Sequence, residues 1–301
     1  MRGFFLGPFI FNRFGSDEAQ DYNLFRRMQF FTHIPQPPLS NFVELFWFYD
    51  GYFAGSHTKE RLMPDGSIEL VINLKENEAR IYDREKLDQC ERLPGAILCG
   101  PHSRFFVIDT AQQDSVMGIH FKPGGAFPFF KIPAGELHNL HVSLEDLWGH
   151  EAGWLRERLL EAQTPQEKFQ VLEQCLLEQA FKPLERHRAV DCALGLFRNI
   201  HTAPAIAELA DHIGISSRRF IQLFSNEVGL TPKLFSRVRR FQQVLQKIRT
   251  GADFSWADMA ASCGYFDQAH FIHDFKEFSG INPTTYLAQK TDHLNHVPIH
   301  Q

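Results

Sequence analysis

Short apolar runs separated by turn signals fill the chain between Phe30 and about Phe130. From Ile68 to Leu74, every second residue is Ile or Leu, which predicts a strand with one better-buried face. Combinations of Pro, Gly and Asp separate the runs and indicate turns. The expected strands cover residues 42–53, 68–74, 96–99, 104–108 and 116–121. We therefore predict a β-sandwich or small barrel over residues 29–133.

Residues 134–183 change to helical spacing. Ser143 precedes Leu, Glu and Asp, which is typical of a helix start, and Thr164 and Glu167 are spaced as a capping box with Pro at the first helical position. These helices form a connector that either closes the β-rich domain or supplies a dimer seam. Residues 184–200 predict one more helix that leads into a new unit.

Residues 205–286 contain one pattern twice. Gly214 recurs as Gly264 at a spacing of 50, and after these glycines the spacing becomes 51. The later pairs are Ser216 with Asp267, Phe220 with Phe271, Phe224 with Phe275, Gly229 with Gly280, and Pro232 with Pro283. Each unit predicts a helix, a tight turn and a second helix that Ser or Asp caps, which is a helix-turn-helix.

We expect the first helix-turn-helix at about 204–228, a linking helix at about 231–250 and the second helix-turn-helix at about 255–279, within an all-α domain over residues 184–290. In unit one, Arg218 and Gln222 lie on the outer face of the second helix. Arg suits guanine and Gln suits adenine in the major groove. A solenoid or a protein-interaction module would also show a short helical repeat.

Charge is distributed unevenly between the two units. The whole chain carries a formal charge of -5, which excludes a uniformly basic coat. Residues 204–250 hold eight Lys or Arg against three acids, a net of +5, whereas residues 251–290 hold two against five, a net of -3. We expect phosphate attraction to come mostly from unit one and the linking helix.

The repeat closely resembles the AraC/XylS family of bacterial transcription regulators over about the last hundred residues. The resemblance rests on Ala205-Ile-Ala-Glu-Leu-Ala, Gly229-Leu-Thr-Pro232, Arg239-Arg240, Gly264-Tyr-Phe-Asp267, His270-Phe271, and Asn282-Pro283-Thr-Thr-Tyr286. It implies two helix-turn-helix subdomains on consecutive major-groove faces of one promoter. The implied base-contact positions are Ser217, Arg218, Ile221, Gln222, Gln268, Ala269, His270 and His273. Ile221 offers no hydrogen bond, and His273 stands where the family often has Arg. Candidate phosphate contacts are Arg219, Asn226, Arg237, Arg239, Arg240 and Lys276.

The N-terminal part resembles a sensor-type domain found ahead of some of these regulators. The matching segments are Met63-Pro64-Asp65-Gly66, residues 118–126, and Leu144-Glu-Asp-Leu147-Trp148-Gly149. The resemblance implies a cupin-like β-fold that senses a small molecule or mediates dimerisation. Candidate ligand contacts, which could equally be turn and rim residues, are Arg61, Asp65, His102, Arg104, His120 and Lys122. The aromatic residues Phe46, Trp47, Phe48, Tyr49 and Phe53 are interpreted as core rather than as a ligand cage.

The two ends of the chain and its cysteines support further expectations about flexible segments, compartment and metal binding. We expect residues 1–28 to be a flexible or spurious extension and residues 291–301 to be a flexible tail. The five cysteines show no zinc-ligand or C-x-x-C spacing, which favours a reduced, cytoplasmic compartment, and we expect no metal and no cofactor. No apolar run approaches the roughly 20 residues needed to cross a bilayer.

Together these patterns predict an α+β protein that binds promoter DNA in a sequence-specific way and responds to a small-molecule effector at its β-rich domain. RNA polymerase and a second copy of the chain are further candidate partners. No catalytic signature is visible, and we expect no enzyme activity. The alternative is a cupin-type enzyme or ligand-binding protein whose helical part serves localisation or protein interaction.

Overall fold

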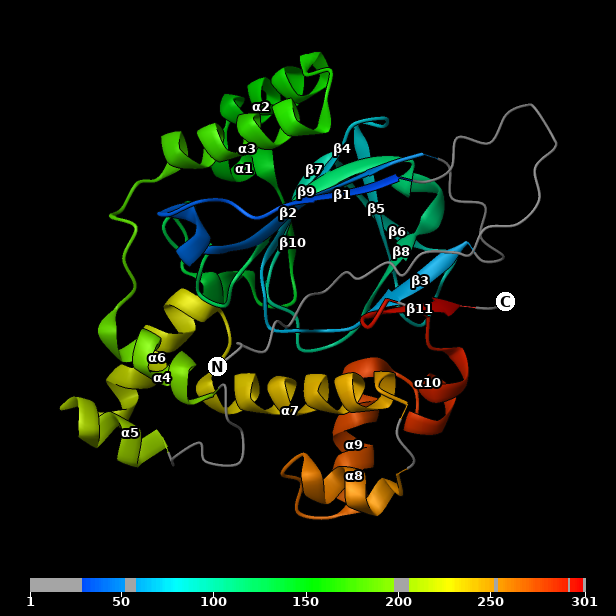
Figure 1. Ribbon diagram of the computed structural model, residues 1–301, viewed down its shortest axis with the longest axis vertical. Helices are drawn as coiled ribbons and strands as arrows, with labels where there is room; N and C mark the ends of the chain where they lie inside the picture. The colour runs from blue at the N-terminus through cyan, green and yellow to red at the C-terminus, as the bar shows by residue number, and fades with distance from the viewer. Residues whose placement is uncertain (1–28, 52–57, 198–205, 252–253, 292, 300–301) are drawn as a thin grey trace.

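The computed structural model describes residues 29–51, 58–197, 206–251, 254–291 and 293–299. Two antiparallel sheets form the N-terminal half, with one group of helices on the outer side of the sheets and the C-terminal helices on another side (Figure 1). The predicted α+β class and the β-sandwich are therefore confirmed. The predicted extension over residues 1–28 and the side chain of Phe53 lie outside the described residues.

The first sheet has the strand order β1-β2-β9-β4-β7-β10 within the described residues. Its strands are β1 (Gln29–His33), β2 (Val43–Asp50), β9 (Ser115–Phe121), β4 (Glu69–Asn73), β7 (Ala96–Cys99) and β10 (His141–Ser143). Strand β10 lies in the segment expected to be a helical connector, so that connector also supplies an edge strand.

The second sheet has the order β11-β3-β8-β5-β6 in the part of the chain that the structure describes. Its strands are β11 (His296–Ile299), β3 (Lys59–Leu62), β8 (Phe106–Asp109), β5 (Glu78–Tyr82) and β6 (Cys90–Pro94). Short 3-10 helices occur at η1 (Leu39–Asn41), η2 (Thr110–Gln113) and η3 (Ala134–Leu137).

Alternation along the strands separates a packed face of the first sheet from a face toward a cavity. On β4, Leu70 and Ile72 are fully buried in the main core, whereas Glu69 and Val71 line the cavity. The same alternation runs along β2, where Phe46 and Phe48 join the main core while Trp47 and Tyr49 line the cavity. Trp47 is also buried in a second apolar cluster with Leu45 and Val116, and Tyr49 packs against this cluster. The interpretation as core is therefore confirmed for Phe46, Trp47 and Phe48, and the alternation of the strand adds that Trp47 and Tyr49 face the cavity.

The helices α1 (Leu144–Trp148), α2 (His150–Glu161) and α3 (Pro165–Gln179) cover the packed face (Figure 1). Both predicted helix starts are confirmed, since Ser143 accepts a hydrogen bond from the Glu145 amide and Thr164 forms the complete capping box with Glu167. Leu155, Leu159, Phe169 and Leu172 pack into the sheet core. These helices thus close the β-domain, as one of the two interpretations expected.

The C-terminal helices follow the predicted repeat. They are α4 (Arg188–Leu196), α5 (Ile206–Ile213), α6 (Ser217–Val228), α7 (Pro232–Arg249), α8 (Trp256–Ser262), α9 (Gln268–Ser279) and α10 (Pro283–Gln289). The pairs α5–α6 and α8–α9 are the two helix-turn-helix units, and α7 runs between them (Figure 1). None of the described helices combines the length and the apolarity that a membrane crossing requires.

The C-terminal segment returns to the β-domain and pairs with it. Strand β11 lies antiparallel to β3, with His296 opposite Leu62 and Val297 opposite Arg61. Val297 is completely buried in the core of the helical domain. The prediction of a flexible tail over residues 291–301 was therefore wrong for His296–Ile299, because these residues complete a sheet edge and bury apolar side chains.

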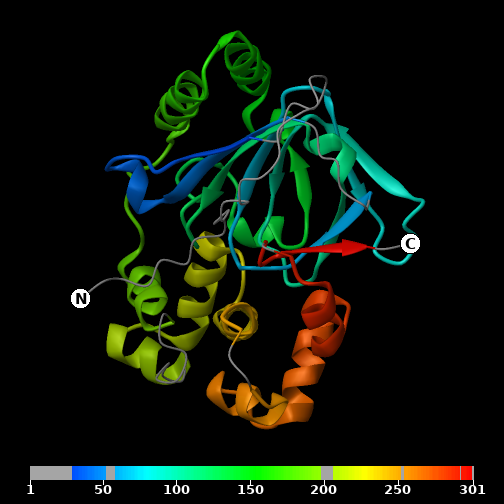
Figure 2. The ribbon, with the colours of Figure 1, turned by 45° about the vertical axis from the view of Figure 1, so that its right-hand side comes forward.

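Both helix-turn-helix units dock onto the β-domain through the same repeated glycine. Gly229 and Gly280 end α6 and α9 in the left-handed conformation, with φ of 88° and 73°. A Cβ added at Gly229 would lie 2.3 Å from Pro101 Cγ, and one at Gly280 would lie 2.3 Å from Phe105 Cε1. Phe105 also donates its backbone N–H to the Phe278 carbonyl at 2.8 Å. The C-terminal end of each recognition helix therefore meets the β-domain, and the helices gather on one side of it (Figure 2).

Candidate functional site

The first recognition helix, α6, presents the predicted base-contact residues near its N-terminus. Ser216 caps the helix and accepts a hydrogen bond from the Arg219 amide at 3.2 Å. Arg218, Ile221 and Gln222 are exposed, and Ser217 is half-buried. Phe220 and Phe224 hold the opposite face in the core with no exposed surface. Packing of the apolar face of α6 therefore fixes the direction in which the exposed face points.

The second recognition helix, α9, repeats this arrangement. Asp267 caps it by accepting from the His270 amide at 2.7 Å. Gln268, Ala269 and His273 are exposed, whereas His270 is half-buried. The eight predicted base-contact positions therefore lie in the N-terminal turns of α6 and α9.

Arg237, a predicted phosphate contact, instead joins α7 to α9. Its Nη2 donates to Asp274 Oδ1 at 2.7 Å and to Glu277 Oε2 at 2.5 Å. The Asp274 side chain is only 2% exposed, so the guanidinium compensates a buried carboxylate. His273 lies near the same two carboxylates in a geometry that could hold a metal ion, but Arg237 already occupies both.

Arg240 is a second predicted phosphate contact with an internal role. Its Nη1 donates to the Gly264 carbonyl at 3.0 Å, and its guanidinium lies over the Tyr265 ring, 5.0 Å from the centroid. These contacts hold the turn of the second unit against α7. Part of the positive charge of the linking helix therefore contacts groups within the protein. A count of charged residues in the sequence does not show this.

The remaining phosphate candidates lie on or near the recognition helices. Lys276 is exposed in the last turn of α9, and Asn226 is half-buried on α6. Arg219 Nη1 donates to Gln222 Oε1 at 3.0 Å, which orients a predicted base-reading amide. Arg239 is half-buried on α7 and interacts with other residues of the protein.

Phe266 is a residue that sequence reasoning missed. Its side chain is 92% exposed, and it stands immediately before the cap of α9. Other residues of the same turn, Cys263 and Tyr265, are buried. The exposed ring of Phe266 therefore lies beside the predicted base-contact positions of α9.

The second candidate site is a cavity between the two sheets. A larger compartment of about 150 Å³ and a smaller one of about 70 Å³ share Glu69, Phe106 and His296 in their walls. The larger compartment is lined by Trp47, Tyr49, Val71, Ile97, Ile108 and Val116, which make it mainly apolar and aromatic. A predominantly apolar cavity with a few polar groups is typical of small-molecule sites.

Charged side chains meet where the two compartments join. Trp47 Nε1 donates to Glu69 Oε1 at 2.8 Å, and His120 Nδ1 lies 3.5 Å from the same oxygen. His120 Nε2 lies 3.5 Å from Asp65 Oδ2. Burial lowers the pKa of His120, but the Glu69 hydrogen bond and the charges of Asp65 and Glu69 outweigh it and raise the pKa to about 9. His120 is therefore an imidazolium at neutral pH.

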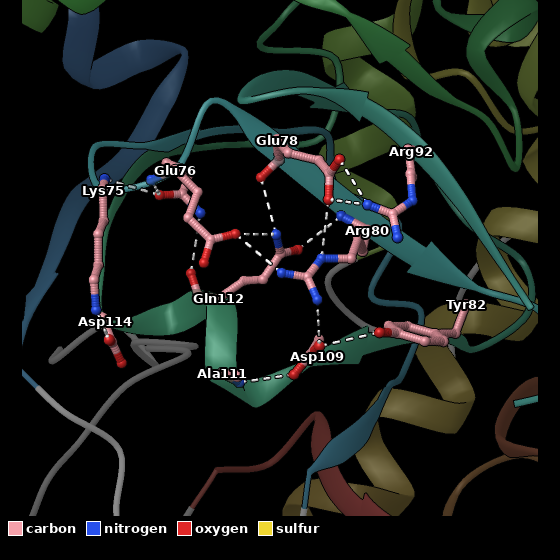
Figure 3. Close-up of polar contacts among 11 residues, drawn as sticks. Lys75, Glu76, Glu78, Arg80, Tyr82, Arg92, Asp109, Ala111, Gln112 and Asp114 are labelled. Atoms are coloured by element: carbon pink, nitrogen blue, oxygen red, sulfur yellow. Dashed lines mark hydrogen bonds and ion pairs between the residues drawn. The ribbon is translucent and has the colours of Figure 1, made fainter. Parts of the chain in front are cut away.

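A network of polar contacts is centred on Arg80 (Figure 3), and its members Arg80, Asp109 and Gln112 line the larger compartment. Arg80, from β5, lies 3.0 Å from Glu76, 3.1 Å from Glu78 and 3.2 Å from Asp109. Gln112 and Tyr82 add hydrogen bonds to Glu76 and Asp109. Three carboxylates thus surround this guanidinium, and its charge is neutralised within the protein.

The six predicted ligand contacts divide into two groups. Asp65, His102 and His120 line the smaller compartment. Arg61, Arg104 and Lys122 lie outside both compartments. Lys122 Nζ donates to the Ser40 carbonyl at 2.6 Å, Arg104 is exposed, and the Arg61 guanidinium lies 5.7 Å from the centre of the Phe105 ring. The sequence analysis did not identify Glu69 as a candidate ligand contact. The signal that could have found it is the alternation along its strand, which directs Glu69 away from the buried side chains of Leu70 and Ile72.

Three successive residues of the C-terminal segment connect the cavity to the helical domain. The Leu294 carbonyl accepts from the Tyr286 hydroxyl on α10 at 2.8 Å. Asn295 Oδ1 accepts from Gln242 Nε2 on α7 at 2.9 Å. His296 Nδ1 lies 2.9 Å from Glu60 Oε2 in the cavity wall. The segment that carries His296 in the cavity wall is therefore hydrogen-bonded to α10 and α7 through the two residues before it.

The buried histidines predict a stability maximum near pH 6.5. Burial lowers the pKa of His102 to about 2 and that of His141 to about 4, so the unfolded state binds more protons below about pH 6.5. Stability therefore decreases as the pH is lowered below this value. The pKa of His120 is raised, so its stabilising contribution is complete below about pH 6.5 and is lost as pH rises toward 9. We expect urea unfolding to give a free energy roughly 1 to 2 kcal/mol lower at pH 8 than at pH 6.5. A flat profile from pH 6.5 to 8 would contradict the charged state of His120, and His120→Gln should remove this alkaline slope.

Comparison with known proteins agrees with the two halves of the structure. Residues 31–143 match a domain of unknown function (DUF6597), and residues 209–289 match a helix-turn-helix domain. No curated protein sequence matches the chain.

Three solved structures are similar to this chain at low identity. ToxT from Vibrio cholerae is 12% identical, with 86% of this chain and 98% of that chain covered and a TM-score of 0.44. ToxT with bound unsaturated fatty acid is 12% identical over 88% and 97% of the two chains, with a TM-score of 0.41. A DNA-binding transcriptional dual regulator from Escherichia coli K-12 is 24% identical over 36% of this chain and 95% of that one, with a TM-score of 0.30.

The matched residues coincide with the elements described above: the first match spans nearly all of the two sheets, and the second spans α6 through α10 with most of α5. The chain therefore combines an N-terminal DUF6597 domain with a C-terminal helix-turn-helix domain of the AraC type.

Proposed function

We propose that this protein is a sequence-specific transcription regulator that docks α6 and α9 in the major groove of promoter DNA under the control of a small molecule. The observation that carries the proposal is the repeated recognition helix, which is capped, packed on one face and exposed at its N-terminal turns in both units. A recognition helix that enters the major groove contacts base edges through these turns. We propose that this function is binding rather than catalysis, and that the protein acts in the cytoplasm with the DNA.

The two units contribute differently to the proposed complex. Arg218 and Gln222 on α6 have hydrogen-bonding groups for guanine and adenine. On α9, Gln268 can read adenine, while Ala269 and the exposed Phe266 offer apolar contacts of the kind that thymine methyl groups receive. We therefore expect unit one to supply most of the charge-assisted contacts and unit two to read base edges with less electrostatic help.

Small-molecule control is supported by the cavity between the sheets. It has apolar walls and a few convergent polar groups. Its wall residue Asn295 is hydrogen-bonded to α7, and the neighbouring Leu294 is hydrogen-bonded to α10.

Binding to RNA polymerase and binding to a second copy of the chain remain predictions. The outer face of α2 and α3 exposes Trp154, Leu160 and Leu177, which is where a second copy would find apolar surface. One chain already holds two DNA-reading units, so the proposed docking does not depend on a dimer.

Replacing Arg218 by alanine tests the proposal directly. Arg218 makes no hydrogen bond or ion pair with the described part of the protein, so we expect its loss to cost about 1 to 3 kcal/mol of DNA binding and to relax the preference at one base pair. Lys276→Ala, by contrast, should weaken all sequences alike and reduce the salt dependence by about one phosphate contact. Arg104→Ala removes an equal charge from the β-domain and serves as the control. Equal losses for Arg218→Ala on specific and random DNA would refute base reading.

A further inference from the structure

We propose that the cavity binds a small organic monocation with an apolar or aromatic body, anchored by Glu69, and that strand β11 transmits its binding to the helix-turn-helix domain. This inference rests on the proposed function and names the ligand class and the path of control. The cavity of about 150 Å³ lies between the sheets, on the face of the first sheet opposite the main core.

Glu69 stands at the point where a charged group would bind. It lines both compartments, and its side chain is 24% exposed although it lies on a central strand. Both Trp47 Nε1 and His120 Nδ1 approach the same oxygen, Oε1. The other carboxylate oxygen, Oε2, is therefore available to a donor in the cavity. An ammonium group is the donor that complements a carboxylate most strongly.

The balance of charge around the cavity favours a cation. Three carboxylates line the two compartments near Glu69, namely Glu60, Asp65 and Glu69 itself, and the imidazoles of His120 and His296 lie beside them. Arg80, also in the wall of the larger compartment, is already surrounded by three carboxylates of its own. Even with both imidazoles protonated, the group around Glu69 holds one negative charge more than positive charge. A single positive charge on a ligand would balance it, whereas an anion would add to the excess.

The walls near Glu69 suit a cation with an apolar body. Trp47 and Tyr49 stand edge to face, with ring centroids 5.6 Å apart, and both line the larger compartment. Phe106 lines both compartments. Aromatic faces attract organic cations, and the attraction increases in a site from which water is excluded. Val71, Ile97 and Val116 provide apolar surface for the rest of the molecule.

His102 supplies a second, independent indication of a ligand. Its side chain lines the smaller compartment, the residue is 7% exposed, and its Nε2 has no hydrogen-bond partner among the described residues. A buried polar nitrogen without a partner is costly, so it indicates a group that arrives from elsewhere. A hydroxyl or amino group on the ligand would form the missing hydrogen bond to His102 if it lay in the smaller compartment while the cation lay beside Glu69.

Strand β11 is positioned to respond when a ligand binds in the cavity. His296 lines both compartments, and the two residues before it are hydrogen-bonded to α7 and α10. A ligand that alters the contact between His296 and Glu60 therefore changes the strand on which α10 rests. Because α9 and α10 share one core, the second recognition helix is the element that this change reaches.

The binding test uses the full chain and three probes of similar size. Calorimetric titration with phenethylamine, phenylpropanol and phenylpropionate compares a cation, a neutral alcohol and an anion on the same aromatic body. We expect phenethylamine to bind at least tenfold more tightly than either other probe. Glu69→Gln should reduce this affinity at least tenfold, while Glu91→Gln, an exposed acid outside the cavity, should leave it unchanged. Preferred binding of phenylpropionate, or binding of no probe, would overturn the ligand class.

The transmission test measures DNA affinity with and without saturating phenethylamine. We expect a change of at least threefold in the parent protein and a smaller one in Gln242→Leu. This substitution removes the hydrogen bonds to Asn295 and to the Pro64 carbonyl, and Gln242 itself does not line the cavity. An unchanged DNA affinity in the parent protein, with phenethylamine bound, would overturn the role of β11. Sequence-specific DNA binding without any amine effect leaves the proposed function standing and refutes only this inference, whereas loss of specific DNA binding under all conditions refutes the proposed function itself.

Discussion

Alanine at Gly229 is expected to destabilise the protein far more than alanine at Gly214, although both glycines have the same backbone conformation. Both lie in the left-handed region, with φ of 88° and 76°, where a side chain costs about 1 to 2 kcal/mol. At Gly229 the new Cβ would also lie 2.8 Å from the Ala134 carbonyl oxygen and 2.3 Å from Pro101 Cγ, whereas at Gly214 it meets nothing within 4 Å. The additional cost is about 1 to 3 kcal/mol, because α6 or the β-domain must shift.

Urea unfolding of the two variants measures this difference at a single pH. Gly214→Ala is the matched control for backbone strain, since it lies in the same helix-turn-helix unit. Equal unfolding free energies for the two variants would show that the C-terminal end of α6 is not held against the β-domain. We also expect Gly229→Ala to weaken binding to specific DNA, because the β-domain no longer fixes the first recognition helix.

Arg237→Ala is expected to lower the free energy of unfolding by about 3 kcal/mol, because it leaves the buried carboxylate of Asp274 without its partner. DNA binding should fail in this variant together with the second helix-turn-helix unit. Lys233→Ala, which removes an exposed charge from the first turn of the same helix, should change stability little. Thermal or urea unfolding of both variants gives the comparison.

A double variant separates this structural role from phosphate contact. Arg237→Met with Asp274→Leu replaces the ion pair by apolar side chains, and such replacements often retain stability. We expect the double variant to recover folding and DNA affinity, with the salt dependence of the parent protein. If Arg237 contacted phosphate instead, the double variant would stay weak on DNA, and its salt slope would fall by about one contact.

The C-terminal fold was predictable because the repeat places each glycine and cap at a defined position. Ser216 and Asp267 cap as expected, and the linking helix Pro232–Arg249 agrees with the predicted range of about 231–250. In the β-domain the apolar strands β4, β7 and β9 were found. Strands β5 and β6 were not predicted, because their residues are charged and half-exposed and carry no period-two apolar signal.

The candidate site was predictable only where function depends on local sequence. The base-contact positions lie near one helix N-terminus each, so the repeat located them. The cavity combines Glu69, Phe106 and His296 from strands far apart in the chain, and strand β11 depends on pairing with a segment more than 200 residues earlier. Arg237 and Arg240 resemble phosphate contacts in sequence, and only their partners on and near α9 reveal another role.

Selection of bound genomic fragments by the purified full-length protein, at near-physiological salt and with sequencing of the retained DNA, tests the central claim most directly. We expect enrichment of one motif with two short elements about one helical turn apart, one for each recognition helix. We also expect Arg218→Ala to alter the motif in a single element. Retention of fragments without any shared motif, by a protein that is folded and binds DNA, would contradict sequence-specific recognition by the two units.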